Sequence, residues 1–193
     1  MKWTKEDRER LLEFKNAQDS DDIRVKEIIK KVLLNNQYII HVLNNKELEE
    51  AEAEADDYFE VNILPRYMIN PTQTNVQNYV CYTVSYDELD RYNSVRKNLE
   101  VTFVILCEHK NIIDRETGIC RHDLLAALIQ DQFNFSNFFG AKLRLVSDLE
   151  SVVDTDYACR TLVFQQVTDN NLVKTINHSP LLANKLYESS LRE

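Results

Sequence analysis

Hydrophobic and polar residues alternate along two segments in the middle of the chain, and this spacing predicts a pair of β-strands. Residues 79–85 (YVCYTVS) alternate cleanly, and in residues 99–107 (LEVTFVILC) every second side chain is apolar and shares one face. Val104 and Leu106 are apolar on the opposite face, so the second half of this strand is expected to be covered on both sides. The intervening residues 86–98 are too many for a tight turn and predict a projecting loop.

A helical pattern follows over residues 122–133 (HDLLAALIQDQF), whose apolar side chains form one stripe directed at the sheet. The aromatic residues after it are interpreted as a plug that closes the turn from helix to strand; they are Phe133, Phe135, Phe138 and Phe139. Two further strands are expected at residues 141–146 (AKLRLV) and 157–166 (YACRTLVFQQ). Lys142 and Arg144 alternate with leucines, which predicts that one face of the strand over residues 141–146 is exposed to solvent.

The N-terminal third has helical spacing instead. A helix is expected over residues 5–15, and a second begins at Ser20 and Asp21 and stops at Asn35 and Asn36. Residues 38–43 (YIIHVL) fit either a helix or a strand. Residues 59–64 predict a strand halted by Pro65, and Ser179 followed by Pro180 predicts a short helix within a C-terminal arm.

These elements predict an α+β fold in which an antiparallel or mixed sheet packs against one central amphipathic helix, with N-terminal helices and a C-terminal arm. The chain of 193 residues is long enough for one domain with extensions. The expected divisions are a helical segment with an acidic linker over residues 1–57, the α+β core over 58–170 and the arm over 171–193.

The net charge of −9 comes almost entirely from one segment. Residues 47–60 hold eight acidic residues and no basic one, whereas the rest of the chain is nearly neutral; the eight are Glu47, Glu49, Glu50, Glu52, Glu54, Asp56, Asp57 and Glu60. A run of like charge is ordinarily a solvated helix or linker. The alternative is a surface that repels DNA or faces a basic partner. No basic face typical of a nucleic-acid clamp is evident.

The cysteines and the hydropathy place the chain among cytoplasmic proteins. Cys81, Cys107, Cys120 and Cys159 are widely spaced, and three of them fall in apolar strands, so buried thiols are expected rather than disulfides. No apolar run reaches the ~20 residues of a membrane span, and the charged start differs from a signal peptide.

Several chemistries are excluded or weakly supported. The chain has only two glycines, Gly118 and Gly140, which rules out a glycine-rich Walker loop or a dinucleotide fingerprint. None of its four histidines has a partner at zinc-ligand spacing. His122, beside Asp123 at a helix start, is interpreted as a surface residue. No catalytic residue, metal or cofactor is predicted.

One enzymatic alternative stays open. Glu108 and Lys110 flank His109 at the end of a strand, with Asp87 and Asp90 upstream, which is similar to the acid-x-lysine pattern of metal-dependent nucleases. In those enzymes carboxylates hold magnesium and the lysine supports the attacking water. Glu13 and Lys15 repeat the pattern inside an expected helix, so the motif arises here without that chemistry.

The core resembles the tail-terminator and tail-completion proteins of long-tailed bacteriophages. The resemblance rests on the strand LEVTFVILCEH, the helix RHDLLAALIQDQF and the late strands AKLRLVS and YACRTLVFQQV, and it covers about residues 59–168. The segment FEVNILPRYMINPTQTNVQNYVCYTVSY also resembles a group of phage neck proteins with an "nIlP" stretch before a strand.

The resemblance implies a virion structural protein, assembled in the host bacterial cytoplasm. It implies a homo-oligomeric ring, often six-fold, that ends tail-tube polymerisation and binds tail-tube and head-connector proteins. DNA would pass through the ring without specific binding, and no membrane is involved. The charged loop suits contacts with a neighbouring ring; its candidate contact residues are Asp87, Glu88, Asp90, Arg91, Arg96 and Lys97. A small cytoplasmic interaction module is the remaining alternative.

Overall fold

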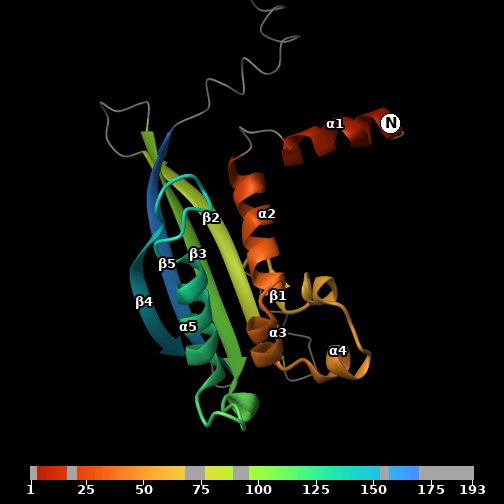
Figure 1. Cartoon of the computed structure of the whole chain (residues 1–193), viewed down its shortest axis with the longest axis vertical. Helices are drawn as coiled ribbons and strands as arrows, with labels where there is room; N and C mark the ends of the chain where they lie inside the picture. The colour runs from red at the N-terminus through yellow and green to blue at the C-terminus, as the bar shows by residue number, and fades with distance from the viewer. Residues whose placement is uncertain (1–3, 17–20, 68–76, 89–95, 153–156, 170–193) are drawn as a thin grey trace, which may run out of the picture.

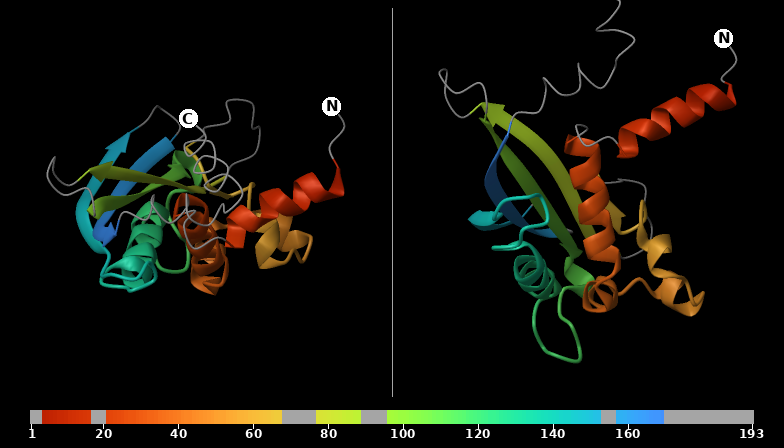
Figure 2. Two further views of the ribbon diagram at one scale, coloured as in Figure 1. Left: turned by 90° about the horizontal axis from the view of Figure 1, so that it is seen from above. Right: turned by 45° about the horizontal axis from the view of Figure 1, so that its top comes forward.

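The computed structural model is an α+β fold built on a mixed five-stranded sheet of order β1-β2-β3-β5-β4 (Figure 1). It describes residues 4–16, 21–67, 77–88, 96–152 and 157–169. The helices α2, α3 and α5 lie on one face of the sheet, as the view from above in Figure 2 shows. Strands β1 and β2 pair in parallel, and the other pairs are antiparallel. The predicted fold class is confirmed.

The elements follow in a simple order along the chain. The N-terminal third is helical, with α1 Lys5–Asn16, α2 Asp21–Leu34, α3 Gln37–Leu43, α4 Lys46–Glu50 and the 3₁₀ turn η1 Ala55–Tyr58. The sheet and its helix follow as β1 Ile63–Leu64, β2 Tyr79–Glu88, β3 Arg96–Glu108, the turn η2 His109–Asn111, α5 Arg121–Phe133, β4 Arg144–Val152 and β5 Tyr157–Asp169.

The main core lies between the sheet and the helices. The predicted inner face of β3 is confirmed, because its alternate residues from Leu99 to Cys107 are buried. Phe103 lies at its centre, with its ring centroid 4.9 Å from that of Phe133 on α5 and 5.7 Å from that of Phe164 on β5. The stripe of α5 thus packs onto the sheet, as the helical spacing predicted.

The end of β3 is buried on both faces, which is also confirmed. On the face away from the helices a small second cluster forms around Leu106, and its members are Leu64, Tyr79, Cys81, Leu106 and Cys159. Cys81, Cys107 and Cys159 are buried free thiols, as expected, and Cys120 is half-buried. Burial raises the pKa of the Cys107 thiol far above its ordinary value.

The undecided segment 38–43 is a helix, because both of its ends are capped. The side chain of Asn36 accepts hydrogen bonds from the backbone N–H groups of Tyr38 and Ile39, and Asn44 ends α3 in the left-handed conformation with φ 49°. Helices α2 and α3 bury Ile29, Leu33, Ile39 and Leu43 in the same core as the sheet. Residues on both sides of the boundary expected at 57 and 58 therefore share one core.

Three local predictions are wrong. The strand expected over 59–64 covers only Ile63–Leu64, because residues 60–62 form a turn in which Glu60 adopts φ 65°. The strand expected over 141–146 is Arg144–Val152, shifted toward the C-terminus. The aromatic plug is incomplete: Phe133 is buried, but Phe135 and Phe138 are exposed, since Phe135 turns the chain outward at φ 59°. The expected C-terminal arm lies outside the described residues.

Candidate assembly surface

Strand β4 is the outer edge of the sheet and is unusually apolar on its exposed side. Among the described residues no strand pairs with its outer side. Three of its apolar side chains face solvent, with Val146 52%, Leu149 63% and Val152 70% exposed. An edge strand presents unpaired backbone N–H and C=O groups that can pair with another chain. This edge, Arg144–Val152, is the β4 edge, and it is the strongest candidate interaction surface of the fold.

Part of the β4 edge is regular enough to extend the sheet. Its register on β5 shifts between Leu145 and Ser147, which places a bulge at Val146. From Ser147 to Val152 the ladder with β5 is continuous. That length is comparable with an ordinary β-strand of ~5–6 residues, so the regular part can accept a further strand.

A network of hydrogen bonds between charged and polar side chains connects β4 to β5 and α5. Arg160 on β5 donates two hydrogen bonds to Asp148 on β4, at 2.8 and 2.9 Å, and another to Asp123 on α5. Gln130 on α5 also donates to Asp148 at 2.9 Å. These donors, Arg160 first, lower the pKa of the Asp148 carboxyl, and the carboxylates raise the pKa of Arg160. The network holds the edge strand against α5.

His122 belongs to this network, and its interpretation as a surface residue is wrong. Its side chain is only 3% exposed, and its Nε2 lies 3.3 Å from Glu150 of β4 and 3.5 Å from Asp123. The first turn of α5 faces the sheet, so position 122 points inward together with Leu125 and Ile129. Helical spacing from Ile129 back to residue 122 was the signal that could have shown this.

The opposite side of the sheet offers a second open edge. Strand β1 pairs only with Val80 and Cys81 of β2. The remaining part of β2, Tyr82–Glu88, has no strand on its outer side within the described ranges. We refer to this part as the β2 edge. The sheet thus has one free edge at each side.

The projecting loop predicted over 86–98 is wrong in its extent, because its flanks continue the ladder. Tyr86, Asp87 and Glu88 pair with Leu99, Asn98 and Lys97, and Arg96 pairs with Asp169 of β5. The cation of Lys97 lies 3.9 Å from the centre of the Tyr86 ring, which helps both strands to continue. Of the candidate contact residues, Asp87, Glu88, Arg96 and Lys97 therefore lie in strands, and Asp90 and Arg91 lie outside the described residues.

The acidic segment is exposed, as its ordinary interpretation predicts. Every one of its eight carboxylates lies on an exposed residue, in α4, η1 and the turns between them. Asp57 accepts a hydrogen bond from the backbone N–H of Glu54 at 2.9 Å, and Glu60 pairs with Arg66 at 2.8 Å. The segment is thus a solvated, locally ordered surface.

Of the residues named for the nuclease alternative, Glu108 and Lys110 are in contact, whereas Asp87 lies far from both. Glu108 is largely buried at the end of β3, and its contact with Lys110 is 3.6 Å. Asp87 pairs with Asn98 at the other end of β3, which places it about 33 Å from Glu108 at roughly 3.3 Å per residue. Asp90 lies outside the described residues. In the described part of the chain no three carboxylate, histidine or cysteine side chains are grouped to hold a metal ion.

The fold defines a sheet-and-helix domain with open edges, and comparison with known proteins assigns it to a family. The family model YomW matches residues 36–166, from the cap of α3 to the last part of β5, so the chain belongs to the YomW family. This family is phage-derived, which agrees with the phage origin that the resemblance implied, but it is not specific to neck or tail-terminator proteins. No curated protein matches the chain. Among the described residues, none of the helices has the length and apolarity to cross a membrane.

Proposed function

We propose that this chain is a structural protein of the phage neck, which forms a homo-oligomeric ring at the end of the tail tube and joins the tail to the head connector. It acts through binding surfaces rather than by catalysis. The observation that carries the proposal is the β4 edge, with Val146, Leu149 and Val152 exposed beside an unpaired backbone. An open edge strand with exposed apolar side chains is a site for a second chain.

The strand directions favour a ring made by extending the sheet. Strand β4 is antiparallel to β5, β5 to β3 and β3 to β2, so β4 and β2 run in opposite directions. When two copies lie edge to edge in the same orientation, the β4 edge of one meets the β2 edge of the next as an antiparallel pair. Such a head-to-tail contact uses two different surfaces, so it closes into a ring when the rotation per copy permits.

The charges favour this pairing over a two-fold contact of β4 with itself. Around a two-fold axis Asp148 would lie near its own copy, and opposed like charges destabilise a ladder. In the head-to-tail pair, Arg144 at the start of β4 approaches Asp87 and Glu88 at the end of the β2 edge instead. The basic end of one edge thus meets the acidic end of the other.

The acidic segment fits a ring through which DNA slides. Its eight exposed carboxylates would repel phosphate groups if they face the lumen. A lumen of this kind allows passage without binding. The proposal places DNA in the ring only as a transient occupant.

The test is the oligomeric state of the purified full chain, measured by mass photometry and negative-stain imaging. The wild-type protein is expected to form one closed species of several copies. Leu149→Lys puts a charge on the β4 edge and should shift the population to monomers by at least tenfold at equal concentration. Ile119→Lys is the matched control, because Ile119 is also exposed, at 47%, but lies in the loop before α5.

Three results would contradict the proposal. A strictly monomeric wild-type chain at all concentrations excludes the ring. An equal response of the Leu149 and Ile119 variants excludes the β4 edge as the contact. Antibody labelling of intact virions tests the location: label at the junction of head and tail supports the neck assignment, and unlabelled virions overturn it.

A further inference from the structure

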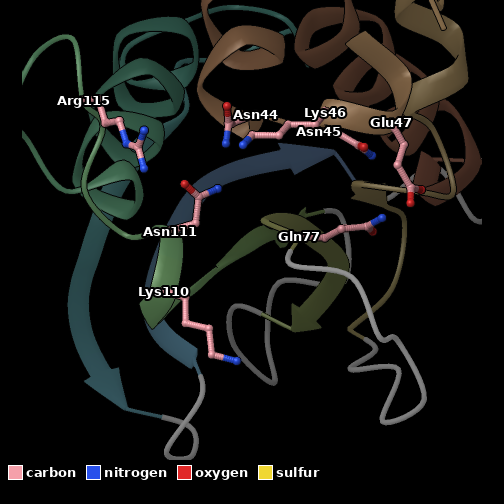
Figure 3. A pocket seen from close by; sticks show the side chains of 8 residues that line it. All are labelled: Asn44, Asn45, Lys46, Glu47, Gln77, Lys110, Asn111 and Arg115. Carbon is pink, nitrogen blue, oxygen red and sulfur yellow. The ribbon is translucent and has the colours of Figure 1, made fainter. Parts of the chain in front are cut away.

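A polar cavity of about 360 Å³ lies at the end of the sheet where β3 stops, away from the β4 edge (Figure 3). Its walls come from four separate parts of the chain. Asn44 comes from the turn after α3, and Lys46 is the first residue of α4. The turn η2 contributes Asn111, the loop before α5 contributes Arg115, and the segment before β2 contributes Gln77. The volume lies within the ~300–1,000 Å³ range of small-molecule sites.

Four side chains in this cavity have their polar groups free. Among the described residues, the side chains of Asn44, Lys46, Asn111 and Arg115 have no hydrogen-bond or ion-pair partner. Figure 3 shows the Lys46 ammonium and the Arg115 guanidinium directed toward the same part of the cavity as the amides of Asn44 and Asn111. Two cations and two amides therefore offer donors to one space.

Lys110 also lines the cavity but takes a different direction. Its side chain points away from these four groups in Figure 3, and its ammonium lies 3.6 Å from the Glu108 carboxylate. Glu47 and Gln77 stand on the other side of the cavity from Arg115. The positive charge is thus concentrated at Lys46 and Arg115.

The wall behind these groups is held in place by buried amides. Asn45 is 3% exposed, donates from Nδ2 to Asn62 at 2.7 Å and accepts from the backbone N–H of Leu48. Asn62 donates to the backbone carbonyl of Asn78, whose own side chain donates to the carbonyl of Leu43. These bonds fix the turn that carries Asn44 and Lys46, which lowers the ordering cost of binding.

We infer that this cavity binds the phosphate group of a small molecule. The planar guanidinium of Arg115 and the ammonium of Lys46 are groups that bind oxyanions, and the side-chain amides in the cavity add neutral hydrogen-bond donors. Phosphate carries close to two negative charges at neutral pH, which the two unpaired cations balance, whereas a carboxylate carries only one. The two cations line one cavity although the chain as a whole carries a charge of −9.

The test is a titration of the full-length chain with inorganic phosphate at constant ionic strength, with chloride as the balancing anion, followed by amide NMR shifts. Saturable shifts are expected at residues 44–46, 111 and 115, with acetate binding at least fivefold more weakly. Arg115→Ala and Lys46→Ala should each weaken phosphate binding by at least fivefold. Lys31→Ala is the matched control and should change it by less than twofold, because Lys31 is an exposed lysine of α2 that does not line the cavity.

Each other outcome overturns the inference. Shifts that do not saturate mean that no site exists, and equal binding of acetate and phosphate means a general carboxylate site. An Arg115→Ala variant that binds like wild type excludes the assigned donors. Thermal unfolding of each variant shows that folding is intact, since Arg115 and Lys46 are exposed. The oligomeric state is unaffected in either case, so this result is separable from the ring proposal.

Discussion

Arg160 is the residue whose replacement should most directly loosen the β4 edge. The substitution Arg160→Met keeps much of the apolar stem but removes three hydrogen bonds to Asp148 and Asp123. It also leaves Asp148 and Asp123 without the arginine that bridges them. We expect the protein to remain folded but to lose stability, with β4 the first element to detach.

The size of the loss follows from the burial of the network. Hydrogen bonds to charged groups contribute ~1.5–3 kcal/mol each, whereas a fully exposed ion pair contributes only ~0.2–1 kcal/mol. Both Arg160 and Asp148 side chains are 25% exposed, so solvent screens part of the interaction. We therefore expect Arg160→Met to reduce the free energy of unfolding by about 2–3 kcal/mol at pH 7. With a urea slope of ~1–3 kcal/mol per molar, the midpoint should fall by about 1 M or more.

The pH dependence of the free energy of unfolding distinguishes the loss of charge interactions from the loss of side-chain packing. Because the pKa of Asp148 is lowered in the folded protein, its contribution is complete above the unfolded pKa of ~3.9 and is lost as the pH falls through the folded pKa. The difference in the free energy of unfolding between wild type and Arg160→Met should therefore be complete at pH 7 and shrink as the pH falls below about 4. Urea unfolding of both proteins at pH 7 and at pH 3 measures this difference.

A second arginine, Arg144, provides the control for Arg160→Met. Arg144→Met changes an exposed arginine on β4, the strand next to that of Arg160, and should shift the free energy of unfolding by at most ~0.5 kcal/mol. An equal penalty for Arg160→Met at pH 7 and at pH 3 would refute the electrostatic reasoning and assign the effect to the packing of the side chain.

Two further predictions concern the interior. Asn62→Ala leaves the buried amide of Asn45 and the carbonyl of Asn78 without their partner, so it should cost about 2–5 kcal/mol in urea unfolding; a loss below 1 kcal/mol would mean that water replaces the bonds. The thiol of Cys107 should react with a thiol reagent at neutral pH at least a hundredfold more slowly than that of half-buried Cys120, because burial raises its pKa and blocks access. Equal rates, measured by mass spectrometry of labelled peptides, would contradict this.

The alternation of apolar residues determined much of the sheet by itself. Leu99, Phe103 and Cys107 could be assigned to one face because side chains two residues apart on a strand always share a face. The stripe of α5 and the exposure of the acidic segment followed from equally local rules, helical spacing and the cost of burying charge. The same local rules gave the α+β class.

Only the tertiary structure decided which strand lies at the edge and what each polar residue contacts. Leu149 looks like a core residue in the sequence, and it is exposed because β4 has no neighbour on its outer side among the described residues. Helical spacing could have placed His122 on the inner side of α5, but its contact with Glu150 depends on where β4 lies. Lys46, Asn111 and Arg115 meet for the same reason: strand order and loop placement bring together residues whose spacing in the sequence carries no signal.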